Sequence, residues 1–203
     1  MDQLERECFK EIEKNNIVKL TYKKYKDIFK EIRPKVNKQI ESAIAKIQKL
    51  KRNKIVIVAG YPGSGKSTVT EMLSKSGYKV LSLDDKIKNY AELNKITKDE
   101  IEKKGTTHIV LDGTFLRQKD FDRFAWTSKI TNLDLIVILM DIPILYAYYN
   151  NVNRCLDRRR SNRKLVPYKV YESMEKTRDV VFPKKGLYVI NYQLLTRMNF
   201  YIK

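Results

Sequence analysis

The chain has 203 residues, which is enough for one α/β domain with a small addition and a well-packed core. Lys and Arg together number 42 against 24 Asp and Glu, so the formal net charge is +18. Such a positive field attracts polyanions and argues against an ordinary enzyme of small neutral metabolites. Lysines that merely solvate helices explain part of this excess, above all in the N-terminal region.

The cysteine and histidine content excludes several kinds of site. Cys8 and Cys155 are too few and too far apart in sequence for a disulfide framework or a zinc site. His108 is the only histidine and precedes a predicted strand, so we expect any general base to be a carboxylate. No signal-peptide stretch or membrane-spanning run is present, and we expect a cytoplasmic protein without a membrane partner. The sequence predicts neither a stable protein partner nor an oligomeric state.

Residues 1–53 are predicted to form a helical N-terminal extension, packed on a main domain that spans residues 54–203. Apolar side chains recur there at helical spacing. They fall into three sets: Leu4, Cys8 and Ile12; Tyr22, Tyr25, Phe29 and Ile32; and, after Pro34, Val36, Ile40, Ile44, Ile47 and Leu50. Because apolar residues at this spacing more often pack than bind, we interpret them as core contacts.

A phosphate-binding loop follows the first predicted strand. Residues 54–59 are apolar and β-branched, which is typical of a buried parallel strand, and a helical pattern follows the loop. The loop matches G-x-x-x-x-G-K-[ST] and consists of Gly60, Tyr61, Pro62, Gly63, Ser64, Gly65, Lys66, Ser67 and Thr68. Its glycines let backbone N–H groups point inward and cradle polyphosphate. We expect Lys66 to reach the β- and γ-phosphates of ATP and Ser67 to ligate Mg²⁺.

The rest of the chain alternates predicted strands and helices. Further strands are expected at 78–83, 108–111, 135–140 and 187–190. Helices are expected at 86–105, with a capping box at 97–100, at 145–160 and from Pro167 to about Val181. An aromatic helix containing Phe121, Phe124 and Trp126 lies between them. Five strands alternating with helices predict an α/β fold of the P-loop NTPase type, with three layers and a mostly parallel sheet.

Acidic residues follow two of these strands, where ligands gather in parallel sheets. Asp84 and Asp85 come after the second strand, and Asp112 comes after the third. A kinase needs one carboxylate to accept the proton of the attacking hydroxyl and another to hold Mg²⁺ through water. We therefore expect the base and the metal-holding carboxylate among these residues, with Asp84 and Asp112 as candidates for the metal; the family resemblance described below implies that Asp84, or Asp85 beside it, is the base.

Arginines gather near the end of the predicted helix 145–160. The helix dipole favours one or two basic residues there, but the cluster holds Arg154, Arg158, Arg159, Arg160 and Arg163. Such a cluster would neutralise the phosphoryl group during its transfer. We predict an arginine-rich lid around residues 154–166, in which Arg158, Arg159 and Arg163 are catalytic.

From about Lys54 to Tyr192 the sequence resembles the P-loop kinases that include phage-type polynucleotide 5′-hydroxyl kinases and the zeta toxins. The loop is similar to the polynucleotide kinase version, in which an Asp after the second strand is the general base, and Asp84 matches that position. Residues 112–114 are similar to the D-x-T turn of those kinases, whereas 113–117 resemble the E-G-T-x-R stretch of the zeta toxins. The segments 158–163 and 166–174 resemble the kinase lid and the V-P-x-x-V-x-x-x-M helix after it, which favours the nucleic-acid branch.

The resemblance also has two departures, both on the substrate side. The arginine that follows the base in polynucleotide kinases is absent, and Lys86 and Lys88 are its possible replacements. The interval between Asp84 and Asp112 is short, so part of the usual substrate-binding helix pair is missing. The candidate substrate-binding residues are Lys86, Lys88, Asp112, Thr114 and Arg117.

Three functions remain compatible with the sequence. The first is an ATP- and Mg²⁺-dependent kinase that phosphorylates a hydroxyl of a nucleic acid, the 5′-OH end of DNA or RNA, and it is favoured by the charge and the lid. The second is a zeta-toxin-like or nucleoside-type kinase acting on a small nucleotide or sugar. The third is a nucleic-acid-binding ATPase without substrate phosphorylation, although Leu111-Asp112-Gly113 lacks the Asp-Glu pair that suits water activation. Fold alone does not decide between them.

Overall fold

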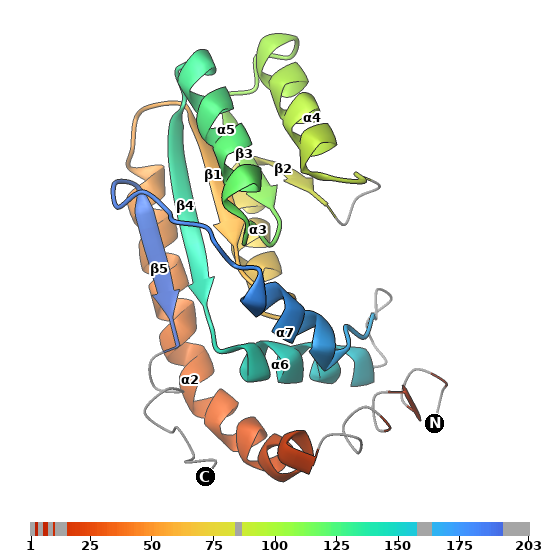
Figure 1. Ribbon diagram of the computed structural model, residues 1–203. Helices are drawn as coiled ribbons and strands as arrows, with labels where there is room; N and C mark the ends of the chain where they lie inside the picture. The colour runs from red at the N-terminus through yellow and green to blue at the C-terminus, as the bar shows by residue number, and fades with distance from the viewer. Residues whose placement is uncertain are drawn as a thin grey trace.

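A computed structural model describes residues 16–83, 87–157 and 164–192, with positions 3, 6, 7 and 10; for residues 16–28 the description covers the backbone. The helices are α2 (Asn16–Gln48), α3 (Lys66–Lys75), α4 (Tyr90–Glu102), α5 (Gln118–Thr131), α6 (Ile144–Leu156) and α7 (Tyr168–Lys176). The strands are β1 (Lys54–Ala59), β2 (Lys79–Ser82), β3 (His108–Asp112), β4 (Asp134–Asp141) and β5 (Leu187–Asn191) (Figure 1).

The five strands form one sheet in the order β2-β3-β1-β4-β5, and every pairing is parallel. The carboxyl ends of all five strands therefore lie at the same end of the sheet (Figure 1). The central strand β1 leads into the predicted phosphate loop, which consequently lies in the middle of this carboxyl end, where parallel sheets of this kind bind ligands. The predicted parallel α/β fold is confirmed.

Alternating side chains of the strands bury both faces of the sheet and create two cores. On one face Val56, Val58 and Val110 pack with residues of α2, α3, α6 and α7. On the other face Ile57 and Leu111 pack with residues of α4 and α5. The sheet is thus the middle of three layers, as the near-continuous apolar runs of its strands predicted.

Helix α2 covers the first of these cores. Its buried side chains there are Ile32, Val36, Ile40, Ala43, Ile44 and Ile47. Leu50, expected in the same stripe, is 39 % exposed because the helix ends at Gln48. The helix also runs through Pro34 as a single element, and residues 49–53 are not helical, unlike the prediction for that stretch. Leu4, Cys8 and Ile12 lie outside the described residues.

Helix α2 also protects the edge of the sheet at β5. The Gln39 amide makes two hydrogen bonds with the backbone of Asn191: Nε2 donates to its carbonyl oxygen at 3.1 Å, and Oε1 accepts from its N–H at 2.9 Å. An edge strand with unpaired backbone groups is prone to pair with other chains. Gln39 occupies those groups where β5 ends.

The predicted bounds of α4 and its capping box are wrong. The helix begins at Tyr90 because Asn89 is its N-cap, and Asn89 Oδ1 accepts a hydrogen bond from Glu92 N at 3.0 Å. Thr97, expected to cap a helix, lies inside α4, and its hydroxyl donates to Leu93 O at 2.7 Å. The helix ends before Gly105, whose φ of 66° suits a terminating glycine.

The two helices that flank the predicted lid are shorter than expected. Helix α6 ends at Leu156 rather than Arg160, because Asp157 has extended backbone angles. Helix α7 ends at Lys176 rather than near Val181, with Thr177 as its C-cap. The segment that joins α6 to α7 includes residues 158–163, which lie outside the described residues.

Candidate active site

Side chains bind the backbone carbonyl oxygens of the predicted phosphate loop. Each carbonyl oxygen from residue 60 to residue 64 accepts a hydrogen bond from a side-chain donor. The bonds are Lys66 Nζ to Gly60 O and Tyr61 O (both 3.0 Å), Tyr171 OH to Pro62 O (3.1 Å), Asn150 Nδ2 to Gly63 O (2.9 Å) and Tyr192 OH to Ser64 O (3.0 Å). The donors belong to α3, α6, α7 and the residue after β5. Four separate parts of the fold thus fix the course of the loop.

This arrangement orients the loop for an anion. Gly60 N and Ser64 N donate to Thr114 O and Tyr61 O, both at 3.1 Å, so the groups suited to an anion are the N–H groups of Gly63, Gly65 and the first turn of α3. Gly63 and Gly65 have φ values of 77° and 95°, the left-handed conformations that such a concave loop requires. Loop and helix N-terminus together fit a polyphosphate group.

Helix α6 lies directly against the loop at Gly63. A Cβ atom on Gly63 would lie 2.2 Å from Ala147 O and 3.0 Å from Asn151 N, both of which are backbone atoms of α6. No side chain fits between them. Gly63 is therefore required by this close approach as well as by its backbone conformation.

The two tyrosines that donate to the loop are buried phenols. Burial raises the pKa of Tyr171 above its ordinary value and raises the pKa of Tyr192 to about 12. Both side chains therefore keep their proton at neutral pH and remain donors to the loop.

A second turn lies beside the loop at the end of β3, here called the Asp112 turn (residues 112–115). Asp112 is in register with Val58 of β1, and Gly60 N donates to Thr114 O at 3.1 Å. The turn is thus tied to the first residue of the phosphate loop. Phe115 adopts φ 47°, a left-handed conformation that costs a bulky residue free energy and often marks a functional site.

Tyr90, the first residue of α4, supports the Asp112 turn. Its hydroxyl accepts a hydrogen bond from Phe115 N at 2.8 Å and lies 2.9 Å from Thr114 Oγ1. Burial raises the pKa of Tyr90, so the phenol is neutral at physiological pH. One side chain therefore holds the backbone of this turn and positions its hydroxyl.

The structure brings together part of the predicted site. Lys66 and Ser67 lie at the start of α3, Asp112 and Thr114 lie in the adjacent turn, and Arg117 is the exposed N-cap of α5. Lys88 is also exposed, in the segment that precedes α4, where its backbone N–H donates to Glu92. The remaining candidates, Asp84, Asp85, Lys86, Arg158, Arg159 and Arg163, lie outside the described residues.

The described side chains fit Mg²⁺ only as a partial set of ligands. Within the described ranges no group of three or more His, Cys, Asp or Glu side chains could hold a metal by itself. Ser67 is exposed on the first turn of α3, and Asp112 is half-buried at the neighbouring strand end. This pair suits a cation that is held mainly by phosphate oxygens and water, as Mg²⁺ is in phosphoryl-transfer enzymes.

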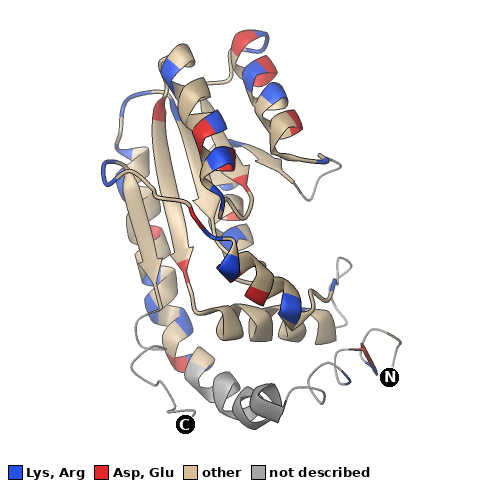
Figure 2. Cartoon of the chain, viewed as in Figure 1, with Lys and Arg blue, Asp and Glu red and all other residues tan. Residues whose placement is uncertain are grey.

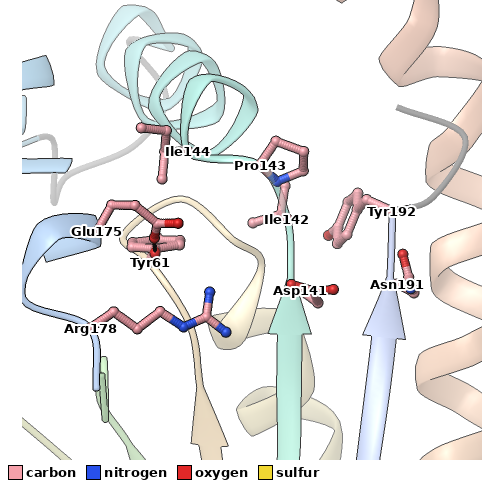
Figure 3. A pocket seen from close by; sticks show the side chains of 9 residues that line it. All are labelled: Tyr61, Asp141, Ile142, Pro143, Ile144, Glu175, Arg178, Asn191 and Tyr192. Atoms are coloured by element: carbon pink, nitrogen blue, oxygen red, sulfur yellow. Dashed lines mark hydrogen bonds between the residues drawn. The ribbon is translucent and has the colours of Figure 1, made fainter. Parts of the chain in front are cut away.

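A pocket of about 320 Å³ opens on the other side of the loop, at the ends of β4 and β5. Tyr61 lines it and donates a hydrogen bond to the carboxylate of Glu175, and Arg178 extends from beyond α7 toward Asp141 (Figure 3). The full lining is Tyr61, Asp141, Ile142, Pro143, Ile144, Glu175, Arg178, Asn191 and Tyr192. Because Tyr61 belongs to both, the pocket adjoins the phosphate loop.

Sequence reasoning identified Lys66, which bonds to the loop, and Tyr61, which lines the pocket, but missed the other side chains that support the two loops. Tyr171, Asn150 and Tyr192 are separated by 109, 87 and 128 positions from the loop residues that they bind. Tyr90 is likewise 25 positions from Phe115. Their spacing in sequence carries no signal of these contacts, because it is the parallel sheet that brings them together.

Comparison with known proteins reveals the fold but no close relative. No known protein family matches the sequence, and no curated protein matches it. A candidate kinase from Chloroflexus aurantiacus superposes with a TM-score of 0.51 at 15 % sequence identity, over 68 % of this chain and 88 % of that one.

Two further structures show weaker likenesses. A gluconokinase from Sinorhizobium meliloti 1021 has a TM-score of 0.49 at 13 % identity, over 69 % of this chain and 83 % of that one. The Pnkp1/Rnl/Hen1 RNA repair complex includes a chain with a TM-score of 0.47 at 18 % identity, over 65 % of this chain and 46 % of that one. The fold of the present chain is thus the one found in P-loop kinases.

No helix in the described part of the chain combines the length and apolar character needed to cross a membrane.

Proposed function

We propose that the chain is a kinase that uses ATP and Mg²⁺ to phosphorylate a hydroxyl of a nucleic acid, the 5′-OH end of DNA or RNA. The observation that carries the proposal is the phosphate loop, whose five consecutive carbonyl oxygens are all engaged by side chains. These bonds fix the loop in a shape in which the N–H groups of Gly63, Gly65 and the first turn of α3 would bind a polyphosphate. Lys66 lies beside the loop and would neutralise the β- and γ-phosphates.

The carboxyl end of the sheet offers one side to ATP and the other to the hydroxyl acceptor. On the β4–β5 side, the pocket beside Tyr61 offers aromatic, amide and charged groups for the nucleoside of ATP. On the β2–β3 side, the Asp112 turn would receive the hydroxyl acceptor. The phosphate loop between them would hold the group that is transferred, which is the geometry that in-line transfer requires.

The remaining roles follow from the sequence. Asp84, or Asp85 beside it, would accept the proton of the attacking hydroxyl, and Asp84 and Asp112 would hold Mg²⁺ together with Ser67. Arg158, Arg159 and Arg163 would neutralise the charge of the phosphoryl group from the lid. Lys86, Lys88, Thr114 and Arg117 would contact the acceptor. The net charge of +18 favours a polyanionic acceptor over a small neutral one.

A parallel assay with γ-labelled ATP tests the proposal. Oligonucleotides with a 5′-OH end, nucleosides and nucleotide sugars would be offered separately to the purified protein. We expect label on the oligonucleotides. Label on nucleosides or nucleotide sugars alone would identify a small-molecule kinase, and ATP hydrolysis without any labelled acceptor would identify an ATPase.

A further inference from the structure

The outward face of α5 exposes the only tryptophan of the chain. Trp126 is 60 % exposed, and Ile130, one turn further along the helix, is 50 % exposed. Phe121 and Phe124 of the same helix are buried against the sheet. The sequence suggested one aromatic helix, but the structure separates the tryptophan from the two phenylalanines and turns it to solvent.

Basic side chains accompany Trp126 on this face of α5. Lys119 and Arg123 are exposed and lie at helical spacing from Trp126, so the three side chains share one face. Lys129 Nζ lies 5.8 Å from the centroid of the Trp126 ring, within range of a cation–π contact. Arg117 adds a further exposed cation at the start of the helix. Figure 2 marks the basic residues along α5 in blue and the acidic ones in red.

Acidic groups on α5 are fewer. Asp120 is half-buried in the first turn, and Asp122 is exposed but accepts a hydrogen bond from Gln118 Nε2 at 2.7 Å. Helix α5 and its N-cap therefore carry four basic and two acidic side chains. The local excess is positive and surrounds an exposed aromatic ring.

The face is continuous with the proposed acceptor side of the site. Helix α5 starts at Gln118, three residues after the end of the Asp112 turn, and runs away from the end of the sheet at which the strands terminate (Figure 1). From Arg117 to Trp126 the helix rises about 14 Å, at 1.5 Å per residue. At about 3.4 Å per nucleotide of a stacked strand, this distance corresponds to roughly four nucleotides.

We propose that the face formed by Arg117, Lys119, Arg123, Trp126 and Ile130 is a track for single-stranded nucleic acid. A base about four nucleotides from the reacting end stacks on Trp126, and the cations neutralise the phosphates that lead to it. This combination of a stacking platform and a basic groove is how proteins hold single strands without sequence preference. A protein partner fits less well, because the core of a protein interface is depleted of charge. The inference rests on the proposed function and names the path of its acceptor.

Intrinsic fluorescence tests the track without requiring turnover. Because Trp126 is the only tryptophan, its emission reports on this face alone. An oligothymidylate of about eight nucleotides, added without ATP, should quench the emission, and added salt should weaken the effect. A dinucleotide, which is too short to reach Trp126, should leave the emission unchanged. Unchanged emission at oligonucleotide concentrations that saturate binding would overturn the track.

Acceptor kinetics supply the second readout. Trp126→Ala should raise the KM for the longer oligonucleotide roughly 5- to 100-fold, as expected for one lost base–aromatic stack, and leave the KM for the dinucleotide unchanged. Trp126→Phe keeps a ring and should restore part of the affinity. Lys46→Ala is the matched control, since Lys46 is exposed on α2, across the sheet from α5. An equal loss for both acceptor lengths, or no loss, would overturn the track.

The two experiments separate this inference from the proposed function. If the longer oligonucleotide is phosphorylated but leaves Trp126 emission unchanged, the track fails and the proposed function stands. If the oligonucleotide quenches Trp126 but only small acceptors are phosphorylated, the proposed acceptor fails and the track stands as a binding surface.

Discussion

The phosphate loop and the Asp112 turn start from paired strands, yet they are held in different ways. The loop is tied by donors from α3, α6, α7 and the residue after β5. The turn depends on the hydroxyl of Tyr90 and on backbone bonds to β1 and to the loop. A loop fixed by four parts of the fold resists change, whereas the turn, which Tyr90 ties to α4, can follow movements of that helix. The difference suits a fixed phosphate site beside an adaptable acceptor site.

Of the changes considered, removal of the Lys66 charge from the phosphate loop should have the largest effect on activity. Lys66→Ala should reduce phosphotransfer by about 10³-fold or more and weaken ATP binding, because no other described cation donates to the loop backbone. The melting temperature should change little, since the Lys66 side chain bonds to two loop carbonyl oxygens and is not part of the buried core. Initial rates and thermal unfolding measure both effects. Lys75→Ala is the matched control, because Lys75 lies at the exposed end of the same helix and pairs with Glu71. Near-normal turnover in Lys66→Ala would contradict the assigned role.

Gly63→Ala should disrupt the loop through its contact with α6. The new Cβ would need space now occupied by Ala147 O, 2.2 Å away, so the loop or the helix has to move. We expect loss of ATP binding together with a fall of more than about 2 kcal/mol in the free energy of unfolding.

Gly105→Ala is a control for Gly63→Ala, because it introduces backbone strain without a steric clash. Gly105 also has positive φ, 66°, but no atom lies within 4 Å of its would-be Cβ. This variant should cost only about 1 kcal/mol and keep its activity. Calorimetric ATP binding and urea unfolding of both variants measure the difference. Equal effects in the two variants would show that close packing against α6 is unimportant.

The sequence predicted the fold because each local signal agreed with the parallel sheet. The apolar run 54–59 and the loop motif marked the elements around the site, and β1 has the predicted bounds. Errors arose where a local pattern had two meanings. Thr97 matches the start of a helix, but Asn89 competes for that role and provides the cap. A short capping pattern does not reveal that a helix has already begun.

The sequence predicted the motif residues of the site but not their supports. Lys66 and Asp112 could be assigned to the site because the local sequence pattern around each residue indicates its chemistry. Tyr171 and Tyr90 could not, since a tyrosine at helical spacing is indistinguishable from a core residue until its hydroxyl partner is known. The sequence likewise placed Trp126 in one aromatic helix with Phe121 and Phe124 and did not reveal which of the three is exposed.

Tyr171→Phe tests the support of the phosphate loop. The change removes the donor to Pro62 O and keeps the aromatic ring that packs against Tyr148. We expect the KM for ATP to rise roughly 2- to 10-fold, equivalent to one hydrogen bond, with an unchanged KM for the acceptor. Steady-state kinetics with each substrate varied in turn measure this split. A rise in the acceptor KM instead would assign Tyr171 to the other half of the site.

Tyr90→Phe is the complementary test on the Asp112 turn. It removes the acceptor of Phe115 N and the partner of Thr114 Oγ1, so the strained turn can relax. The KM for the acceptor should rise by a similar factor of roughly 2 to 10, while the KM for ATP stays the same. Opposite effects of Tyr171→Phe and Tyr90→Phe on the two KM values would establish that the two loops are supported independently. If each variant raises both KM values equally, the comparison between the loops fails.

The smallest expected effect concerns the alkaline stability of the phosphate loop. Burial raises the pKa of Tyr192 to about 12, whereas an unfolded tyrosine ionises near pH 10. Below pH 10 the phenol is neutral in both states, and its hydrogen bond to Ser64 O stabilises the fold by about 1 kcal/mol. Between pH 10 and 12 only the unfolded state releases the proton. The free energy of unfolding therefore falls by up to about 1.4 kcal/mol per pH unit from this group.

Tyr192→Phe cannot ionise and should lack this contribution. The wild-type protein should be more stable than Tyr192→Phe at pH 8, and the advantage should shrink to nothing about one pH unit above 10. Urea unfolding of both proteins from pH 8 to 11.5 measures the difference, in which the titration of lysines and of the other tyrosines cancels. Tyr188→Phe, on the half-buried part of β5, is a matched control. An advantage that stays constant with pH would mean that Tyr192 ionises equally in both states and is not held as a buried donor.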